Sequence, residues 1–181
     1  MAATDSTTPV IPPAKLAHLV LRTSRFDEVA DWWTTVLGAT PRHQNDFITF
    51  LTYDDEHHRL AIIKIPDLGD DARRSAGMEH VAFTYDHLDD LLATYGRLAA
   101  AGIMPIAPIN HGMTLSLYYA DPDGNQVELQ VDTMTPTDAE TFMAGDVFAA
   151  NPIGVKFDPD DLVARRANGE SVESLVAYEP A

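Results

Sequence analysis

A carboxylate stands in the middle of a segment where burial would normally exclude one. Glu128 lies in the run Gly-Asn-Gln-Val-Glu-Leu-Gln-Val-Asp, residues 124–132. Because a β-strand turns alternate side chains to opposite faces, Gln126, Glu128 and Gln130 share one face, and the aliphatic residues of the run take the other. The pattern predicts a strand with one buried apolar face and one polar face that carries a single ionisable group.

Two further strand-like segments each carry one histidine in an otherwise apolar run. His18 lies in Lys-Leu-Ala-His-Leu-Val-Leu, and His80 lies in Met-Glu-His-Val-Ala-Phe. Two imidazoles and one carboxylate make up a three-ligand set for a divalent metal ion that leaves coordination positions open for chemistry. The chain has no cysteine, so a metal would be held by nitrogen and oxygen donors alone.

The same series of predicted elements follows each histidine. After the first, a capping-box pattern begins at Ser24, and an apolar helical stripe runs up to Gly38. After the second, Asp86 can cap another helix, which ends near Gly102. Three strand candidates follow each helix, at residues 39–45, 47–53 and 58–66 and at residues 103–109, 113–120 and 124–131.

This repeat predicts an α+β fold. Residues 14–66 and 78–132 would each form a βαβββ module, and the two modules would curl their sheets into an open β-barrel around one cavity. Residues 1–13 are expected to be a flexible lead. Residues 133–181 are expected to form a helical and irregular C-terminal extension, with a helix from Asp138 to Ala150, that clasps the barrel or contacts a second subunit.

Length and charge exclude several classes of function. A chain of 181 residues can form one domain, or two small halves that share a core. Twelve basic residues against 28 acidic ones give a net charge of −16, which argues against nucleic acid and anionic membranes as partners. The chain has no apolar run long enough to span a membrane, and its N-terminus has no signal-peptide pattern. We therefore expect a cytoplasmic protein.

The pattern resembles the vicinal oxygen chelate superfamily, which includes glyoxalases, bleomycin resistance proteins and extradiol dioxygenases. The resemblance covers residues 15–132. Its most specific stretch is His-Gly-Met-Thr-Leu-Ser-Leu-Tyr-Tyr-Ala-Asp-Pro-Asp-Gly-Asn-Gln-Val-Glu-Leu, residues 111–129, which looks like the metal-ligand end of type I extradiol ring-cleaving dioxygenases. That family takes its ligands from positions that fall here on His18, His80 and Glu128. Each histidine alone is more often a structural residue, but the three together favour a metal site.

The number of ligands distinguishes members of this superfamily. Glyoxalase I-like isomerases have a fourth ligand on the last strand of the first module, where this chain has Leu-Ala-Ile-Ile-Lys-Ile, residues 60–65. That stretch, around Ile62, is expected to hold the place that Glu128 holds in the second module, and it offers no ligand. Three ligands suit Fe(II), with Mn(II) as the alternative. Antibiotic-sequestering relatives lack the ligand set.

Three more residues resemble groups that line the substrate pocket in biphenyl-diol dioxygenases. His58 matches the second histidine of a paired-histidine segment, His111 matches another pocket histidine, and Tyr118 matches a pocket tyrosine in its spacing from Glu128. Strand alternation also places Tyr118 on the polar face, independently of the resemblance. The structural alternatives are a solvated turn at His58 and a core ring at Tyr118.

The resemblance implies an Fe(II)-dependent extradiol dioxygenase that cleaves a catechol-type aromatic diol with O2. His58 or His111 would serve as the acid-base group, because an imidazole titrates near neutral pH, and Tyr118 would donate a hydrogen bond to a substrate oxygen. The alternatives are a metal-dependent isomerase, epimerase or lyase on the same scaffold and a non-catalytic small-molecule binding protein. A single pair of modules also implies a homodimer.

Overall fold

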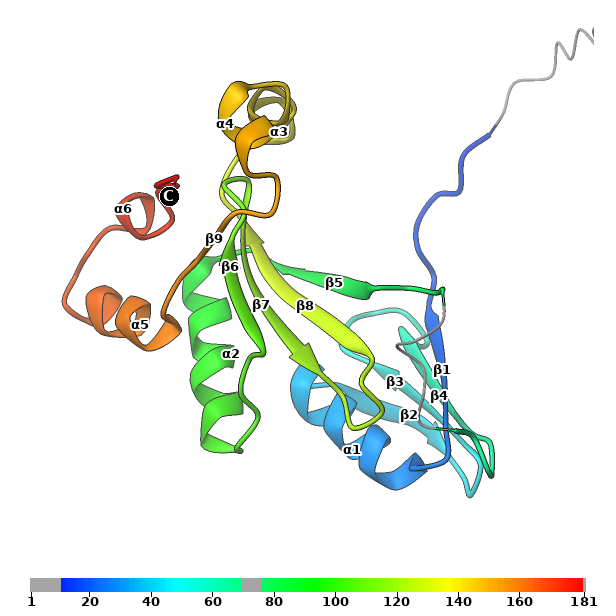
Figure 1. Cartoon of the computed structure of the whole chain (residues 1–181). Coiled ribbons are helices and arrows are strands. Elements are labelled where there is room, and N and C mark those ends of the chain that lie inside the picture. The colour runs from blue at the N-terminus through cyan, green and yellow to red at the C-terminus, as the bar shows by residue number, and fades with distance from the viewer. Residues whose placement is uncertain (1–10, 70–75, 181) are drawn as a thin grey trace, which may run out of the picture.

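The computed structural model describes residues 11–69 and 76–180, which form two β-sheets with their helices and a C-terminal extension (Figure 1). Residues 1–10 of the predicted N-terminal lead lie outside the described residues. The first sheet and its helix comprise β1 (Leu19–Thr23), α1 (Phe26–Leu37), β2 (Thr40–Gln44), β3 (Ile48–Thr52) and β4 (Leu60–Lys64). The second set comprises β5 (His80–Tyr85), α2 (Leu88–Ala100), β6 (Ala107–Asn110), β7 (Thr114–Ala120) and β8 (Gln126–Asp132).

The two sheets repeat one topology. The strand order is β1-β4-β3-β2 in the first and β5-β8-β7-β6-β9 in the second, where β9 (Val155–Lys156) comes from the extension. In each sheet the first strand pairs in parallel with the last strand of its unit, and the other pairs are antiparallel. The α+β class with two mixed sheets is therefore confirmed. The described strands form no closed barrel, because no pairing joins β1 to β5, and the open barrel around a metal ion stays a prediction.

The helices end where the sequence predicts but begin later. Gly38 closes α1 in the left-handed conformation, with φ of 59°, as expected for a glycine that follows a helix. The predicted capping box at Ser24 is wrong, because Arg25 is the N-cap residue and makes no side-chain cap. Thr23 at the end of β1 accepts the backbone N–H of Arg25 at 2.8 Å instead. The predicted cap at Asp86 is also wrong, since α2 begins after His87.

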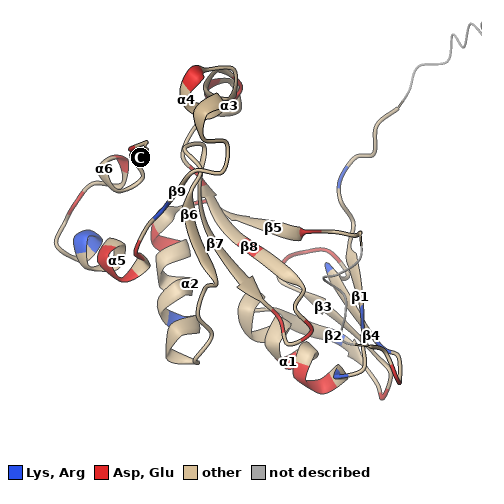
Figure 2. Cartoon of the chain, viewed as in Figure 1, with Lys and Arg blue, Asp and Glu red and all other residues tan. Residues whose placement is uncertain are grey.

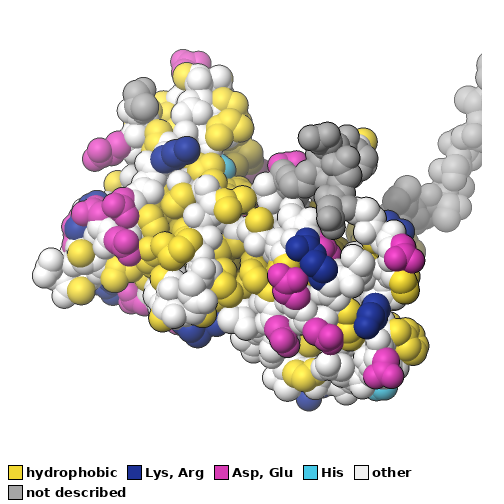
Figure 3. All heavy atoms as spheres, turned by 60° about the horizontal axis from the view of Figure 1, so that its bottom comes forward, with side chains coloured by type: hydrophobic (Ala, Val, Ile, Leu, Met, Phe, Trp, Pro, Cys, Tyr) yellow, Lys and Arg dark blue, Asp and Glu magenta, His cyan; other side chains and the backbone are white. Residues whose placement is uncertain are grey.

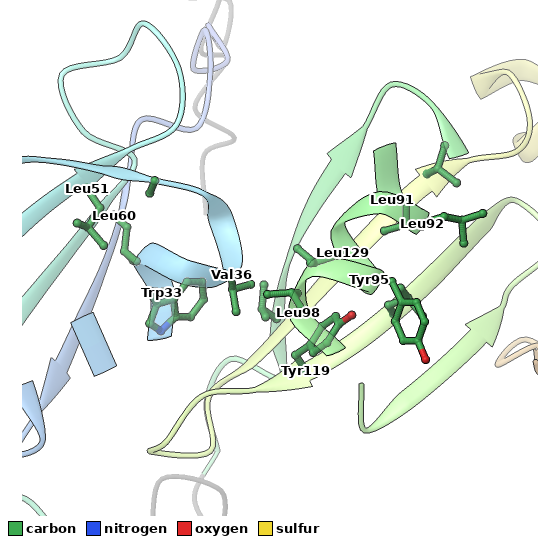
Figure 4. Close-up of a cluster of buried hydrophobic side chains, with 14 of the residues drawn as sticks. Trp33, Val36, Leu51, Leu60, Leu91, Leu92, Tyr95, Leu98, Tyr119 and Leu129 are labelled. Carbon is green, nitrogen blue, oxygen red and sulfur yellow. The ribbon is translucent and has the colours of Figure 1, made fainter. Parts of the chain in front are cut away.

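One hydrophobic core joins the two halves. Trp33 and Val36 on α1 point toward Leu98 on α2 and toward Tyr119 and Leu129 on the second sheet (Figure 4). Polar contacts reinforce this junction. The Trp33 indole Nε1 donates to the Asp121 carboxylate at 2.9 Å. The Arg97 guanidinium donates to the last carbonyls of α1, at 2.6 and 3.1 Å, where a helix end leaves acceptors without partners.

The C-terminal extension forms α3 (Pro136–Met143), α4 (Asp146–Ala150), β9, α5 (Pro159–Ala167) and α6 (Val172–Leu175). The single helix predicted from Asp138 to Ala150 is wrong, because Gly145 is extended, with φ of −91° and ψ of 163°, and separates α3 from α4. The strand β9 was not foreseen: it adds to the free edge of β6. The extension also meets α2, where the Tyr95 hydroxyl donates to Asp160 at 2.7 Å.

Charged residues lie mainly on helices and loops (Figure 2). Glu128 and Asp132, both on β8, are the only acidic residues within the described strands. Figure 3 shows hydrophobic side chains gathered in one area of this face, while Lys, Arg, Asp and Glu are scattered over the rest. No helix in the described part of the chain is long and apolar enough to cross a bilayer.

Candidate metal centre

The polar face of the second sheet is built by strand alternation on β8. Val127 and Leu129 point into the core beneath α2, so Glu128 points to the opposite face. The strand is central, with β5 on one side and β7 on the other. Glu128 is therefore only 5% exposed, even though the face it occupies is polar.

His80 and Glu128 are brought together on this face. His80 begins β5, the strand that pairs in parallel with β8. Its Nε2 atom lies 3.0 Å from Oε2 of Glu128. An imidazole nitrogen and a carboxylate oxygen this close can bind one metal ion with small movements of the two side chains.

Tyr118 and His111 continue the row of polar groups. Tyr118 lies directly opposite Glu128 in the pairing of β7 with β8. Its hydroxyl is 3.0 Å from Nε2 of His111, and its ring meets the ring of His80 edge to face, with centroids 5.2 Å apart. Burial raises the pKa of Tyr118 above its ordinary value, and the negative charge of Glu128 and a hydrogen bond to it raise that pKa further. The phenol therefore keeps its proton at neutral pH.

His18 and His58 form a second group, on the first sheet. Their rings lie 4.5 Å apart, and His58 also contacts the ring of Phe50 at 4.7 Å. His57, which the sequence analysis did not single out, has its Nδ1 atom 2.6 Å from Nδ1 of His58. Burial lowers the pKa of His58, and positive charge on His18 and His57 lowers it further. His58 is thus held toward the neutral imidazole, the form that can accept a proton.

His18 is not brought into contact with the His80–Glu128 pair. It lies just before β1, at the edge of the first sheet, and lines a cavity of about 140 Å³ together with Val81 and Ala82 of β5. It therefore faces the strand that carries His80. Among residues 11–69 and 76–180, no group of three His, Asp or Glu side chains is arranged to hold a metal ion.

The register shows which residue of the first module corresponds to Glu128. Glu128 lies beside Ala82, two residues after His80, and the residue two after His18 is Val20, which lies beside Ala61. Within the stretch predicted around Ile62, Ala61 therefore holds the place of Glu128, and the Ile62 side chain is buried in the core. A methyl group cannot bind a metal, so no fourth ligand is available at this position.

The donor set suits a divalent transition metal, although the geometry supplies only part of it. His80 and Glu128 offer nitrogen and oxygen within one hydrogen-bond length, and His18 could complete a facial set of three if β1 and β5 closed over the cavity between them. Two of the three predicted ligands therefore fit as they stand, and the third does not.

Comparison with known proteins identifies the family. The model of the "Glyoxalase/Bleomycin resistance protein/Dioxygenase superfamily" matches residues 15–129, most of the chain. The chain belongs to this superfamily. The resemblance seen in the sequence is therefore confirmed, and His18, His80 and Glu128 all lie within the matched residues.

Among relatives in the superfamily, "Biphenyl-2,3-diol 1,2-dioxygenase 2" from Rhodococcus globerulus is 44% identical over 91% of this chain and 87% of that protein. "Probable lactoylglutathione lyase" from Vibrio cholerae is 27% identical over 64% of this chain and 88% of that protein. A glyoxalase/dioxygenase structure from Nostoc punctiforme shares the fold, with a TM-score of 0.58, 17% identity and coverage of 71% and 100% of the two chains. A match over 91% of the chain includes most of residues 133–181, which the superfamily model leaves out.

Proposed function

We propose that this protein is an Fe(II)-dependent extradiol dioxygenase that cleaves the ring of a catechol-type aromatic diol with O2. The observation that carries the proposal is the row of His80, Glu128, Tyr118 and His111 on one polar sheet face. The 44% identity to a dioxygenase named for a vicinal diol supports the same reaction and substrate class.

His80 and Glu128 would hold the metal, joined by His18 once β1 and β5 close over the cavity between them, with Mn(II) as the alternative to Fe(II). The ion would supply a site at which a vicinal diol and O2 react. The chain's own groups would bind and orient the diol. Tyr118, protonated at neutral pH, would donate a hydrogen bond to a substrate oxygen. His58 and His111 are the candidates for moving the substrate's hydroxyl proton.

Oxygen consumption tests the proposal. Protein purified without air should contain ferrous ion, and it should consume one O2 for each catechol converted to a yellow ring-cleavage product. Substrate turnover without oxygen uptake would instead indicate the isomerase, epimerase or lyase alternative. Tight binding of a diol with neither turnover nor oxygen uptake would indicate a binding protein. The dimeric state and the cytoplasmic location stay predictions.

Tyr118→Phe should lower turnover on the order of 10²-fold and leave the metal content near that of the wild type. The substitution removes only the hydroxyl, which is not needed as a ligand. Because burial and Glu128 raise the pKa of Tyr118 above 10, the hydroxyl is protonated throughout the working range, and the deficit should be the same between about pH 6 and 9. Steady-state oxygen uptake on iron-loaded protein measures it.

Tyr119→Phe is the matched control. Tyr119 is the next residue on β7, but it faces the core, and its buried hydroxyl has no hydrogen-bond partner within the described residues. Its removal should leave kcat unchanged. Equal losses in the two variants, or no loss in Tyr118→Phe, would show that the Tyr118 hydroxyl does not take part in the reaction.

A further inference from the structure

The turn between β6 and β7 that carries His111 is held by the C-terminal extension. Asn110, the last residue of β6, is 5% exposed and pairs with Val155 of β9. Its side-chain amide donates to the carbonyl oxygens of Val176 and Ala177, at 3.2 and 3.3 Å. Two separate segments of the extension therefore contact the residue that precedes His111.

Phe142 of α3 encloses the other side of the turn. Gly112, the residue after His111, has φ of 87°, and a β-carbon there would overlap the ring of Phe142. The ring thus rests directly on the Gly112 backbone. The Thr133 hydroxyl, where the extension begins, donates to the Gly112 carbonyl. The position of Phe142 in turn depends on ring contacts with Phe148 and Tyr178, at 5.8 and 5.6 Å.

Gly154, just before β9, makes a further close contact between the extension and the His111 turn. Its φ is 94°, and a β-carbon there would collide with the carbonyl oxygen of Asn110 and would lie 2.9 Å from the α-carbon of His111. Collision with backbone atoms cannot be relieved by a side-chain rotation. The glycine is therefore required for the extension to approach the His111 backbone this closely.

The turn itself leaves the imidazole of His111 free to reach the site. The backbone N–H of His111 donates to Thr114 at 2.9 Å, and that of Gly112 donates to the Asn110 side chain at 2.8 Å. With its backbone held in this way, His111 places Nε2 3.0 Å from the Tyr118 hydroxyl. Tyr118 lies opposite Glu128 in the strand pairing, so the contacts made by the extension lead through His111 and Tyr118 to a predicted metal ligand.

We propose that the C-terminal extension is a positioning element: Phe142, Gly154 and the Val176 and Ala177 carbonyls that Asn110 of β6 binds set the place of His111 relative to Tyr118. The extension contributes no residue to the reacting atoms. It acts through the His111 turn, which it contacts from α3, from β9 and from the segment after α6. The catalytic consequence rests on the proposed dioxygenase function, whereas the structural part does not.

Amide exchange in the metal-free protein tests the structural part. In Phe142→Ala and in Gly154→Ala, the amide hydrogens of His111 and Gly112, followed by NMR, should exchange at least about tenfold faster than in the wild type. The imidazole ¹⁵N signals of His111 should shift as the hydrogen bond to Tyr118 is lost. Phe142→Ala should stay folded, because α3 has no buried residue. Thermal unfolding of Gly154→Ala should show that this variant is folded before its exchange rates are compared.

Gly169→Ala is the matched control for Gly154→Ala. Gly169 also lies in the extension, and its φ of 87° gives a similar backbone strain, but a β-carbon there meets no atom within 4 Å. Exchange at the His111 turn should match that of the wild type in this variant. Unchanged exchange in both Phe142→Ala and Gly154→Ala would overturn the proposal.

A double-mutant cycle on oxygen uptake tests the catalytic part. Phe142→Ala should lower kcat with little change in KM, and adding it to His111→Ala should cause no further loss, because both changes remove the same contact. Phe142→Leu, which keeps an apolar side chain over Gly112, should recover part of the activity. If the kcat losses of Phe142→Ala and His111→Ala multiply in the double variant, the extension acts by a route other than His111. A loss of kcat in Phe142→Ala with none in His111→Ala would show the same. If the wild type consumes no oxygen with any catechol, the proposed function fails, while the exchange result still decides the positioning role.

Discussion

Glu128→Ala should lower oxygen-dependent ring cleavage by at least about 10³-fold and remove most of the bound ferrous ion. The carboxylate is the single buried acidic group on the polar face, and it lies 3.0 Å from His80. The protein should stay folded, because the core uses the opposite face of β8. Metal analysis of anaerobically purified protein, thermal unfolding and oxygen uptake measure the three outcomes.

Gln130→Ala is the control for this prediction. Gln130 lies on the same face of the same strand, two residues beyond Glu128. Its side-chain amide donates a hydrogen bond to the Thr84 hydroxyl at 3.0 Å. Its loss should leave metal content and turnover close to those of the wild type. Stoichiometric iron in Glu128→Ala would refute the ligand assignment.

Imidazole binds a metal only when neutral, so the iron affinity of the wild type should also fall as the pH drops below about 6.

Trp33→Ala should destabilise the protein by about 3–5 kcal/mol, the range for removing a large aromatic side chain from a core. Trp33 is fully buried at the junction of the two halves (Figure 4). Its ring lies 6.4 Å from that of Phe83. Its removal also leaves the buried carboxylate of Asp121 without one of its hydrogen-bond donors. Urea unfolding at equilibrium gives the change in the free energy of unfolding.

The neighbouring Trp32 provides the comparison. Trp32 is half-buried and packs against the core without being part of its fully buried set. Trp32→Ala should therefore cost less than half as much as Trp33→Ala. Trp33→Phe, which keeps most of the ring, should fall between wild type and Trp33→Ala. Equal losses in the two alanine variants would mean that the junction of the two halves does not depend on Trp33.

Local periodicity was sufficient to predict the faces of β7 and β8. Alternation on β7 and β8 placed Tyr118 and Glu128 on one polar face, and the pairing of the strands makes them direct neighbours. The register also follows from this alternation, since a shift by one residue would turn Glu128 into the core and Leu129 out of it. The repeat of strand, helix and three strands was predictable for the same reason: each element shows its own hydrophobic period.

Local patterns were less reliable at the ends of helices. Ser24 and Asp86 both have the side chains that favour a cap, yet α1 and α2 begin after Arg25 and His87. The choice depends on where the preceding strand stops. Thr23 is buried at the end of β1 and accepts the backbone N–H of Arg25, so the chain turns into the helix one residue later than its capping box suggests.

The sequence by itself determined the polar strand faces, the paired modules and the set of residues able to do chemistry. The tertiary structure decided which of these residues meet. His80 lies against Glu128, whereas His18 stacks on His58 across the cavity from β5. The tertiary structure also decided that the C-terminal extension packs around the turn at His111. These contacts join segments far apart in the chain, and no hydrophobic period links such segments, because their approach depends on how whole sheets and helices pack together.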